Sequence, residues 1–330
     1  ELPDDEVRIR ALASGLGVTL DEFRSKMTRA TGRNFVYLRR RISPPEADLI
    51  LSLGIPGVYG EREYHRFYPA GEVTAHVVGF TDIDDRGQEG IELSFDHWLK
   101  GEPGKKKVLK NLYGEVVKDL MPIAEAVPGR ALQLSIDQRL QFLAYRELKS
   151  AVQQYEALSG SMVLLDVHTG EILAMVNQPS YNPNNRIQLD LSSVRNRAIT
   201  DTFEPGSTVK PLTVAIALQS GKPADFIVDT HPGFMRVGDA VIRDPRNRGE
   251  LDLGGILAHS SQVGISRLAL MVNEYDVWNL FQKLGFGEVT GIGFPGESSG
   301  FLPNRRRWKD VERVTFAYGY GLTVTPLQLA

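Results

Sequence analysis

The sequence predicts an α+β fold in two domains, residues 1–128 and 129–330. The 330 residues exceed what one ordinary hydrophobic core holds. Apolar residues recur at helical spacing in several segments of both halves. Between residues 161 and 176, two apolar runs flank a His-Thr-Gly turn, which is typical of a β-hairpin. We therefore expect an antiparallel sheet with helices in the second domain, preceded by an α+β domain.

Short elements are expected in the first domain. Apolar spacing favours helices at residues 7–16 and 20–27. Ser43, followed by two prolines and Glu46, indicates the capped start of a third helix, which should end near Gly54. The remaining elements expected in this domain are strands at residues 35–38 and from Lys105 onward, and one helix that carries Ile91, Phe95, Trp98 and Leu99 on a single face.

The second domain should begin after residues 126–129. Residues 131–136 alternate as a strand does, and Asp137 is placed to cap a long helix. The hairpin follows, with strands at residues 161–167 and 171–176. After a loop at residues 181–185, the sequence is expected to be mainly helical.

Composition excludes several classes of protein. The net charge is −3, so no basic excess points to nucleic acid. Cysteine is absent, which excludes disulfides, zinc–thiolate sites and thiol nucleophiles. No apolar run reaches the roughly 18 residues that span a bilayer. Residue 1 is Glu and not Met, so we expect a piece of a longer protein whose signal or membrane anchor lies outside this chain.

The stretch around Ser207 is the most informative about chemistry. Pro211 is comfortable only in the first turn of a helix, so a helix must start close to Ser207. The Ser207 hydroxyl then lies at the positive end of the helix dipole, beside free backbone N–H groups. Lys210, three residues on, shares a face with that hydroxyl. A buried lysine has a lowered pKa and can take the proton of an adjacent serine, which would make Ser207 a nucleophile without histidine.

Further motifs accompany this stretch in a specific order. Ser260-Ser261-Gln262 follows Ser207 by 53 residues, and a Tyr-Gly-Tyr-Gly segment at residues 318–321 precedes Val-Thr-Pro at 324–326. With residues 66–79, 87–101, 166–175, 181–185, 195–197 and 203–211, the chain resembles the class B penicillin-binding proteins of the cell-division type, the septal peptidoglycan D,D-transpeptidases. The resemblance implies a penicillin-binding, serine β-lactamase-like transpeptidase fold in the second domain and a non-catalytic pedestal or dimerisation-type domain before it.

The resemblance also implies roles for particular residues. Ser207 is similar to the nucleophile that attacks a stem peptide ending in D-alanyl-D-alanine, Lys210 to its general base, and Ser260 to the proton shuttle for the leaving amine. Thr208, Gln262 and Tyr320 are similar to substrate-binding residues. No metal or organic cofactor is implied. The implied partners are stem peptides, β-lactam antibiotics, an FtsW-like glycosyltransferase and other divisome membrane proteins, with the catalytic part in the periplasm and an anchor in the bacterial inner membrane.

Two departures from the family pattern stand out. Gln262 occupies the position of the family's Asn, and no Lys-Thr-Gly or Lys-Ser-Gly occurs in the chain. The family's third motif lies well beyond the Tyr-Gly-Tyr-Gly segment, so we expect it, and the strands that complete the sheet, after Ala330.

Two other functions remain open on these residues. A β-lactamase or β-lactam sensor shares Ser-x-x-Lys, although the long first domain argues against it. A catalytically impaired division scaffold would explain Gln262 and the absent third motif. A Ser–His–Asp triad through His259 is disfavoured, because no Gly-x-Ser-x-Gly sequence surrounds Ser207.

Overall fold

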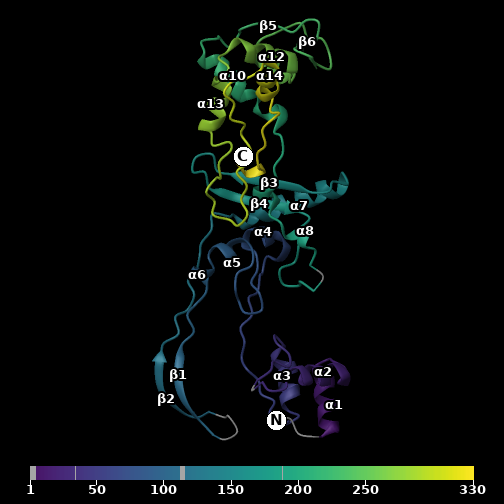
Figure 1. The fold of residues 1–330 in the computed structure, drawn as a ribbon, viewed down its shortest axis with the longest axis vertical. Coiled ribbons are helices and arrows are strands. Elements are labelled where there is room, and N and C mark those ends of the chain that lie inside the picture. Colours follow the sequence, from purple (N-terminus) through teal and green to yellow (C-terminus); the bar gives the residue numbers. More distant parts are fainter. Residues whose placement is uncertain (1–4, 34, 112–115, 188) are drawn as a thin grey trace. The chain divides into compact units, whose positions relative to one another are not determined.

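The computed structural model describes residues 5–33, 35–111, 116–187 and 189–330. Two compact units are present, Glu1–Phe67 and Tyr68–Ala330, and each is described by itself. Figure 1 labels their helices and strands.

The first unit is a small helical cluster. Its elements are α1 (Glu6–Gly15), α2 (Leu20–Arg29) and α3 (Pro44–Leu51). Thr19 with Glu22 and Ser43 with Glu46 form capping boxes, so the free N–H groups at the starts of α2 and α3 find acceptors. The three predicted helices are confirmed. Their buried faces meet in a core of Leu12, Ala13, Leu16, Phe23, Ile50 and Ile55.

The strand predicted at residues 35–38 is wrong. Residues 35–38 are irregular, and the carbonyl oxygen of Leu38 accepts from the Lys26 ammonium at 2.7 Å in place of a strand neighbour. Phe35 is 61% exposed and Tyr37 is 42% exposed. An apolar run becomes a strand only where another strand pairs with it, and here none does within the described residues.

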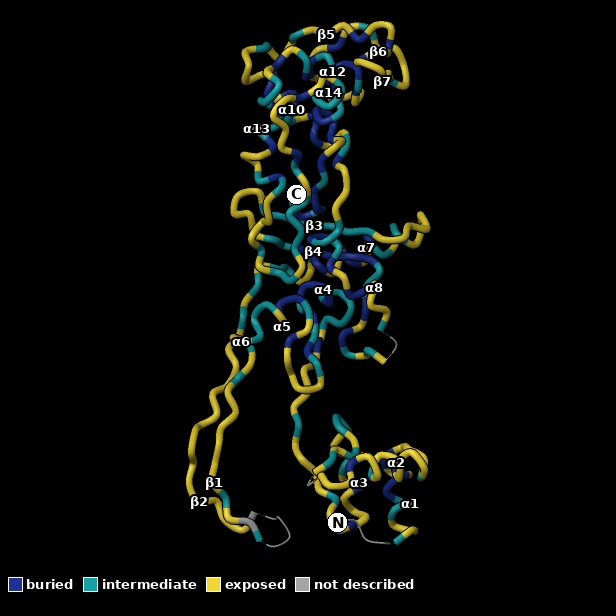
Figure 2. Tube along the Cα trace, in the orientation of Figure 1, coloured by how far each residue is buried: buried dark blue, intermediate teal, exposed yellow. Residues whose placement is uncertain are grey.

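Four short helical segments and a hairpin open the second unit. They are η1 (Gly71–Val73), α4 (Ala75–Val78), α5 (Gly90–Ser94), α6 (Asp96–Leu99), β1 (Lys105–Lys110) and β2 (Val116–Ala124). The single helix predicted through residues 91–99 is instead two, since Phe95 leaves the helical region at φ −115° and ψ 24°. The strand predicted from Lys105 is confirmed. It pairs antiparallel with β2, and Figure 2 shows this hairpin exposed along most of its length.

A second hairpin and a long helix form the middle of this unit. The elements are α7 (Gln138–Gln154), β3 (Gly160–Leu165) and β4 (Ile172–Gln178), and all three confirm predictions. Asp137 caps α7 as predicted, accepting from the N–H groups of Arg139 and Leu140. One face of the hairpin packs on α7 through Ala174 and Val176.

The strand predicted at residues 131–136 is also wrong. Among the described residues, this segment forms no ladder of backbone hydrogen bonds with β4. The Ser135 hydroxyl donates to the Ile172 carbonyl oxygen and, just after the segment, the Asp137 N–H donates to the Leu173 carbonyl oxygen. Leu132, Leu134 and Ile136 still pack against the core that Met175 and Ile199 share with Val77 and Ile91. Val77 and Ile91, which precede residue 128, contribute to this core. The compact units accordingly divide after Phe67. The division into functional domains at residues 128 and 129 stays a prediction.

The rest of the second unit surrounds the Ser207 stretch. Its helices are α8 (Leu191–Val194), α9 (Arg197–Thr200), η2 (Gly206–Val209), α10 (Lys210–Gln219), α11 (Leu253–Ala258), α12 (Gln262–Met271), α13 (Asp276–Lys283), α14 (Asp310–Ala317) and α15 (Pro326–Leu329). The strands are β5 (Val228–Asp229), β6 (Phe234–Val237), β7 (Ala240–Arg243) and β8 (Glu250–Leu251), paired antiparallel as β5–β8 and β6–β7. The mainly helical prediction therefore missed four short strands.

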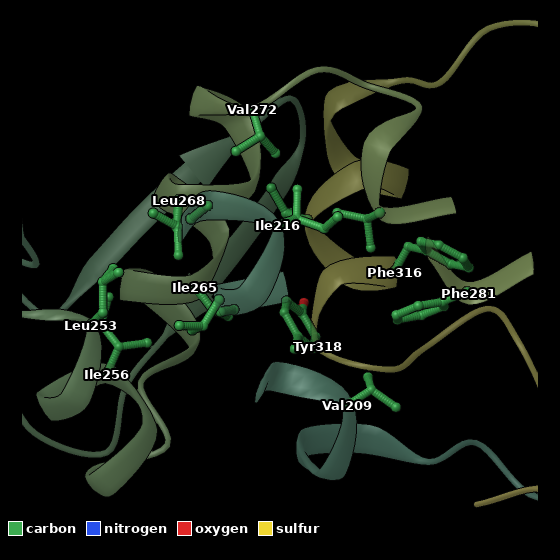
Figure 3. Packing of buried hydrophobic residues seen from close by; sticks show 14 of the residues in the cluster. Val209, Ile216, Leu253, Ile256, Ile265, Leu268, Val272, Phe281, Phe316 and Tyr318 are labelled. Atoms are coloured by element: carbon green, nitrogen blue, oxygen red, sulfur yellow. The ribbon is translucent and has the colours of Figure 1, made fainter. Parts of the chain in front are cut away.

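One large apolar core joins α10 to α14. Ile216 of α10, Ile265 and Leu268 of α12, and Phe316 of α14 are among its buried residues (Figure 3). Phe281 packs its ring against Phe316, with centroids 5.0 Å apart. Val209, directly before Lys210, is also in this core, so its packing fixes the start of α10.

Candidate active site

Ser207 lies on a tight turn that leads directly into α10. Gly206 has φ +58°, a conformation that glycine adopts without strain, and η2 continues into α10 with Pro211 in its first turn. The predicted helix start close to Ser207 is thus confirmed. The Ser207 side chain is exposed while its neighbour Val209 is buried, so the turn presents the hydroxyl outward from a fixed backbone.

Lys210 is the most deeply buried cation near this turn. Its side chain is 1% exposed, and its ammonium donates to the Ser260 carbonyl oxygen at 2.6 Å and to the Ser260 hydroxyl at 3.0 Å. Burial lowers the pKa of Lys210, and the negative charge of Asp244 partly opposes that shift. The structure therefore brings together two of the predicted catalytic side chains, Lys210 and Ser260, one helical turn from Ser207.

Ser260 is held in a conformation unusual for serine. It lies between α11 and α12 with φ +50°, and its N–H donates to the Leu257 carbonyl oxygen at 3.0 Å. His259 is the C-cap of α11, and Ser261 caps α12. The tight connection between two helices turns the Ser260 carbonyl oxygen and hydroxyl toward the same ammonium.

Asp244 is a site residue that the sequence prediction missed. It follows β7, and its carboxylate accepts from the Ser261 hydroxyl at 2.5 Å, from the Gln262 N–H at 2.6 Å and from the Val263 N–H at 3.1 Å. A carboxylate at this helix start satisfies free N–H groups and complements the helix dipole. No local motif identifies Asp244, because its partners lie 17 to 19 residues further on.

The three predicted substrate-binding residues are placed differently. The Thr208 hydroxyl donates to the Pro205 carbonyl oxygen at 2.7 Å, within the turn. Gln262 is half-buried at the start of α12, and the structure gives its side-chain amide no hydrogen bond to any described residue. Tyr320 is 46% exposed, with its ring edge-on to Tyr318 at 5.6 Å. Their roles toward a substrate stay predictions.

Metal and membrane signals are absent from the described part of the chain. No group of three His, Asp or Glu side chains there could hold a metal ion. Among residues 5–33, 35–111, 116–187 and 189–330, no helix is both long and apolar enough to cross a bilayer.

A cavity of about 430 Å³ lies elsewhere in the second unit. It is lined by His76, Glu89, Tyr181, Asn196 and Phe294, among others, and does not include Ser207. We place the candidate active site at Ser207 because this exposed serine lies one helical turn before the buried Lys210, the two residue types that a serine nucleophile and its base require.

An exposed serine on the turn that starts a helix, with a buried lysine one turn further along, is an arrangement typical of enzymes that form an acyl-serine intermediate. Family comparison agrees. Residues 160–330 match the penicillin-binding protein transpeptidase domain, and residues 3–134 match the penicillin-binding protein dimerisation domain. The chain belongs to the FtsI-like class B penicillin-binding proteins, as the sequence predicted.

Individual relatives are similar over nearly the whole chain. The peptidoglycan D,D-transpeptidase FtsI of Escherichia coli is 47% identical over 98% of this chain and 55% of its own length. The probable peptidoglycan D,D-transpeptidase PenA of Neisseria meningitidis is 40% identical over 100% of this chain and 57% of its own. The chain thus spans a little over half the length of these relatives.

Solved structures give the same fold. Penicillin-binding protein 3 of Mycobacterium tuberculosis superimposes with a TM-score of 0.71 at 30% identity, covering 80% of this chain and 56% of the other. A peptidoglycan glycosyltransferase from Burkholderia ambifaria gives a TM-score of 0.55 at 38% identity, covering 60% of this chain and 59% of the other.

Proposed function

We propose that the full-length protein is a peptidoglycan D,D-transpeptidase whose nucleophile is Ser207. The Ser207 oxygen forms an ester with the carbonyl carbon of the penultimate D-alanine, and the bond to the terminal D-alanine nitrogen breaks. Lys210 accepts the serine proton, and Ser260 passes a proton to the departing amine. An amine of a second stem peptide then attacks the ester, which restores Ser207 and forms the cross-link.

The position of Lys210 carries this proposal. Lys210 is 1% exposed, and its side-chain nitrogen lies 3.0 Å from the Ser260 hydroxyl. The neutral amine can accept a proton there, and the ammonium can donate one. Because burial lowers its pKa, Lys210 reaches the neutral, basic form at a lower pH than an exposed lysine does. The same geometry supports acylation by β-lactams, which present a strained amide to the serine.

Trapping with benzylpenicillin tests the assignment. One covalent adduct should form on the full-length protein, mapped by mass spectrometry to the peptide that contains Ser207, and Ser207→Ala should abolish it. An adduct that persists in Ser207→Ala would refute the nucleophile. Lys210→Ala should slow acylation on the order of 100- to 10,000-fold. In the unaltered protein, the acylation rate should rise with pH, with a midpoint below the ordinary pKa of lysine.

The same experiment separates the other candidate functions. A division scaffold without catalysis would form no adduct, whereas a β-lactamase would form one and release hydrolysed penicillin with rapid turnover. A transpeptidase should keep the adduct long enough to isolate it.

We further propose that the protein acts in septum synthesis on the periplasmic side of the bacterial inner membrane, with an FtsW-like glycosyltransferase as partner. The similarity to FtsI supports this cellular role. After chemical cross-linking of dividing cells, the two proteins should be isolated together from the membrane fraction. A fluorescent fusion of the full-length protein that never accumulates at the division site would contradict the proposal.

A further inference from the structure

The loop that carries Tyr320 is attached to the nucleophile turn at several points. Phe203 and Val324 exchange backbone hydrogen bonds at 3.0 Å in both directions. Closer to the serine, the Gly206 N–H donates to the Gly319 carbonyl oxygen at 3.0 Å. Ser207 and Tyr320 are the residues that directly follow this glycine pair, so the pairing brings the two side chains to the same edge of the site.

The approach of the two backbones is too close for any side chain. A Cβ at Gly319 would lie 2.1 Å from the Gly206 carbonyl oxygen, and Gly319 has φ +89°. Glycine at this position is therefore required both by space and by conformation. The contact fixes the backbone on the N-terminal side of Tyr320.

Glu204 fixes the other side. Its carboxylate oxygen Oε1 accepts from the N–H of Gly321 at 2.8 Å, a contact between residues 117 positions apart. The Tyr320 N–H itself donates to the Thr315 carbonyl oxygen at 3.0 Å. Tyr320 thus has a restrained backbone on both sides, while its ring remains 46% exposed and free to contact a ligand.

We propose that Glu204 is a positioning residue, which holds the ring of Tyr320 beside Ser207 for recognition of the acyl donor. This inference rests on the proposed function of the Ser207 site. Among the described residues, one oxygen of the Glu204 carboxylate accepts a hydrogen bond, so this position needs an acceptor and not a negative charge. Glu204 acts through Tyr320, and its effect should disappear when the ring is absent.

A double-mutant cycle on the full-length protein tests the proposal. Acylation by benzylpenicillin is resolved into the dissociation constant of the first complex and the limiting acylation rate. Glu204→Ala should raise the dissociation constant about tenfold, the scale of one lost hydrogen bond, and change the limiting rate less than about twofold. Glu204→Gln should recover most of the affinity because its amide oxygen reaches the same N–H. In a Tyr320→Ala background, Glu204→Ala should have no further effect.

Specific results would overturn the proposal. Additive effects of Glu204→Ala and Tyr320→Ala would mean that Glu204 does not act through the ring. Equal losses in Glu204→Gln and Glu204→Ala would mean that charge, and not the acceptor, matters. If Glu204→Ala does not fold, Glu204→Asp decides, since its carboxylate falls one methylene short and normal binding by that variant would exclude the role.

Glu297→Ala is the matched control. Glu297 also accepts a backbone N–H through Oε1, from Thr290 at 2.6 Å, and among the described residues no hydrogen bond joins either of them to the Ser207 turn or to the Tyr320 loop. It should leave the dissociation constant unchanged, and a tenfold rise in this control would contradict a specific role for Glu204. Failure of the proposed function itself would be visible separately, as an adduct that remains in Ser207→Ala.

Discussion

Gln262 is the residue at which this site departs from the Ser-x-Asn pattern that the family resemblance leads us to expect. Its backbone N–H is bound by Asp244, whereas its side-chain amide has no hydrogen bond to any described residue. Among the predicted site residues, Lys210 has hydrogen bonds to Ser260 and none to Gln262. The amide of Gln262 is thus available for a substrate, on a stem one methylene longer than that of Asn.

We predict that Gln262→Asn raises the rate at which a penicillin acylates the protein about ten- to 100-fold. The shorter side chain restores the amide position expected from the family pattern. A misplaced buried hydrogen bond costs about 1–3 kcal/mol, which corresponds to this range of rates. Stopped-flow acylation of the full-length protein measures the effect, and the melting temperature should not change. An unchanged or lower rate would show that the site is adapted to glutamine.

At the scale of elements, α12 depends on a carboxylate that another element supplies. Asp244 follows the β6–β7 hairpin and accepts three hydrogen bonds at the start of α12, next to Ser260. The hairpin and the helix are therefore joined at the point where the Ser260 turn must keep φ +50°. The electrostatic effect of Asp244 also reaches Lys210, whose pKa it raises against the larger effect of burial.

We predict that Asp244→Asn shifts the pH dependence of acylation to lower pH. Without the negative charge, nothing opposes the effect of burial, so the pKa of Lys210 falls further. The full-length variant should also lose about 1–3 kcal/mol of stability from weakened helix capping. Rates of benzylpenicillin acylation over a pH series give the profile.

Asp252→Ala provides the control for this variant. Asp252 caps the neighbouring helix α11, where it accepts from the Gly255 N–H at 2.6 Å. This control should lose stability without moving the pH profile. A profile that Asp244→Asn leaves in place would contradict the electrostatic link to Lys210.

At the scale of the whole second unit, buried polar side chains join segments far apart in the chain. His76 of α4 donates from Nε2 to the Ser193 carbonyl oxygen at 2.8 Å, across 117 positions. The Asn177 amide of β4 donates to Asn196 at 2.8 Å, and Asn196 donates to the His76 carbonyl oxygen at 3.3 Å. These contacts hold the segment around Ser193 and Asn196 to α4 and β4.

We predict that the second unit loses stability as the pH falls from about 6.5 to about 4. Burial, aided by the charge of Arg197, lowers the pKa of His76 to about 4 from 6.5. Between these values the unfolded chain binds a proton that the folded chain does not, so the stabilisation present above pH 6.5 is lost, up to about 3 kcal/mol. Chemical denaturation of the full-length protein at several pH values measures it.

In His76→Gln, the number of protons taken up on unfolding between pH 6.5 and 4 should be smaller by up to one, so the unfolding free energy should depend less on pH. The variant should also be less stable overall. The exposed His97 is the matched control, and His97→Gln should keep the full dependence. An identical slope in the unaltered protein and in His76→Gln would exclude His76 as the cause.

Local chemistry in the sequence determined the caps of α2, α3 and α7, the β3–β4 hairpin and the Ser207 turn, because each rests on neighbours a few residues apart. The family motifs likewise predicted Ser207, Lys210 and Ser260, and the structure brings Lys210 and Ser260 into contact, while their catalytic roles stay predictions. Only the tertiary structure decided which apolar runs become strands: residues 35–38 and 131–136 do not, and β5 to β8 do. It alone also placed Asp244 under α12 and Glu204 against Gly321, since such contacts join residues up to 117 positions apart and no local pattern encodes them.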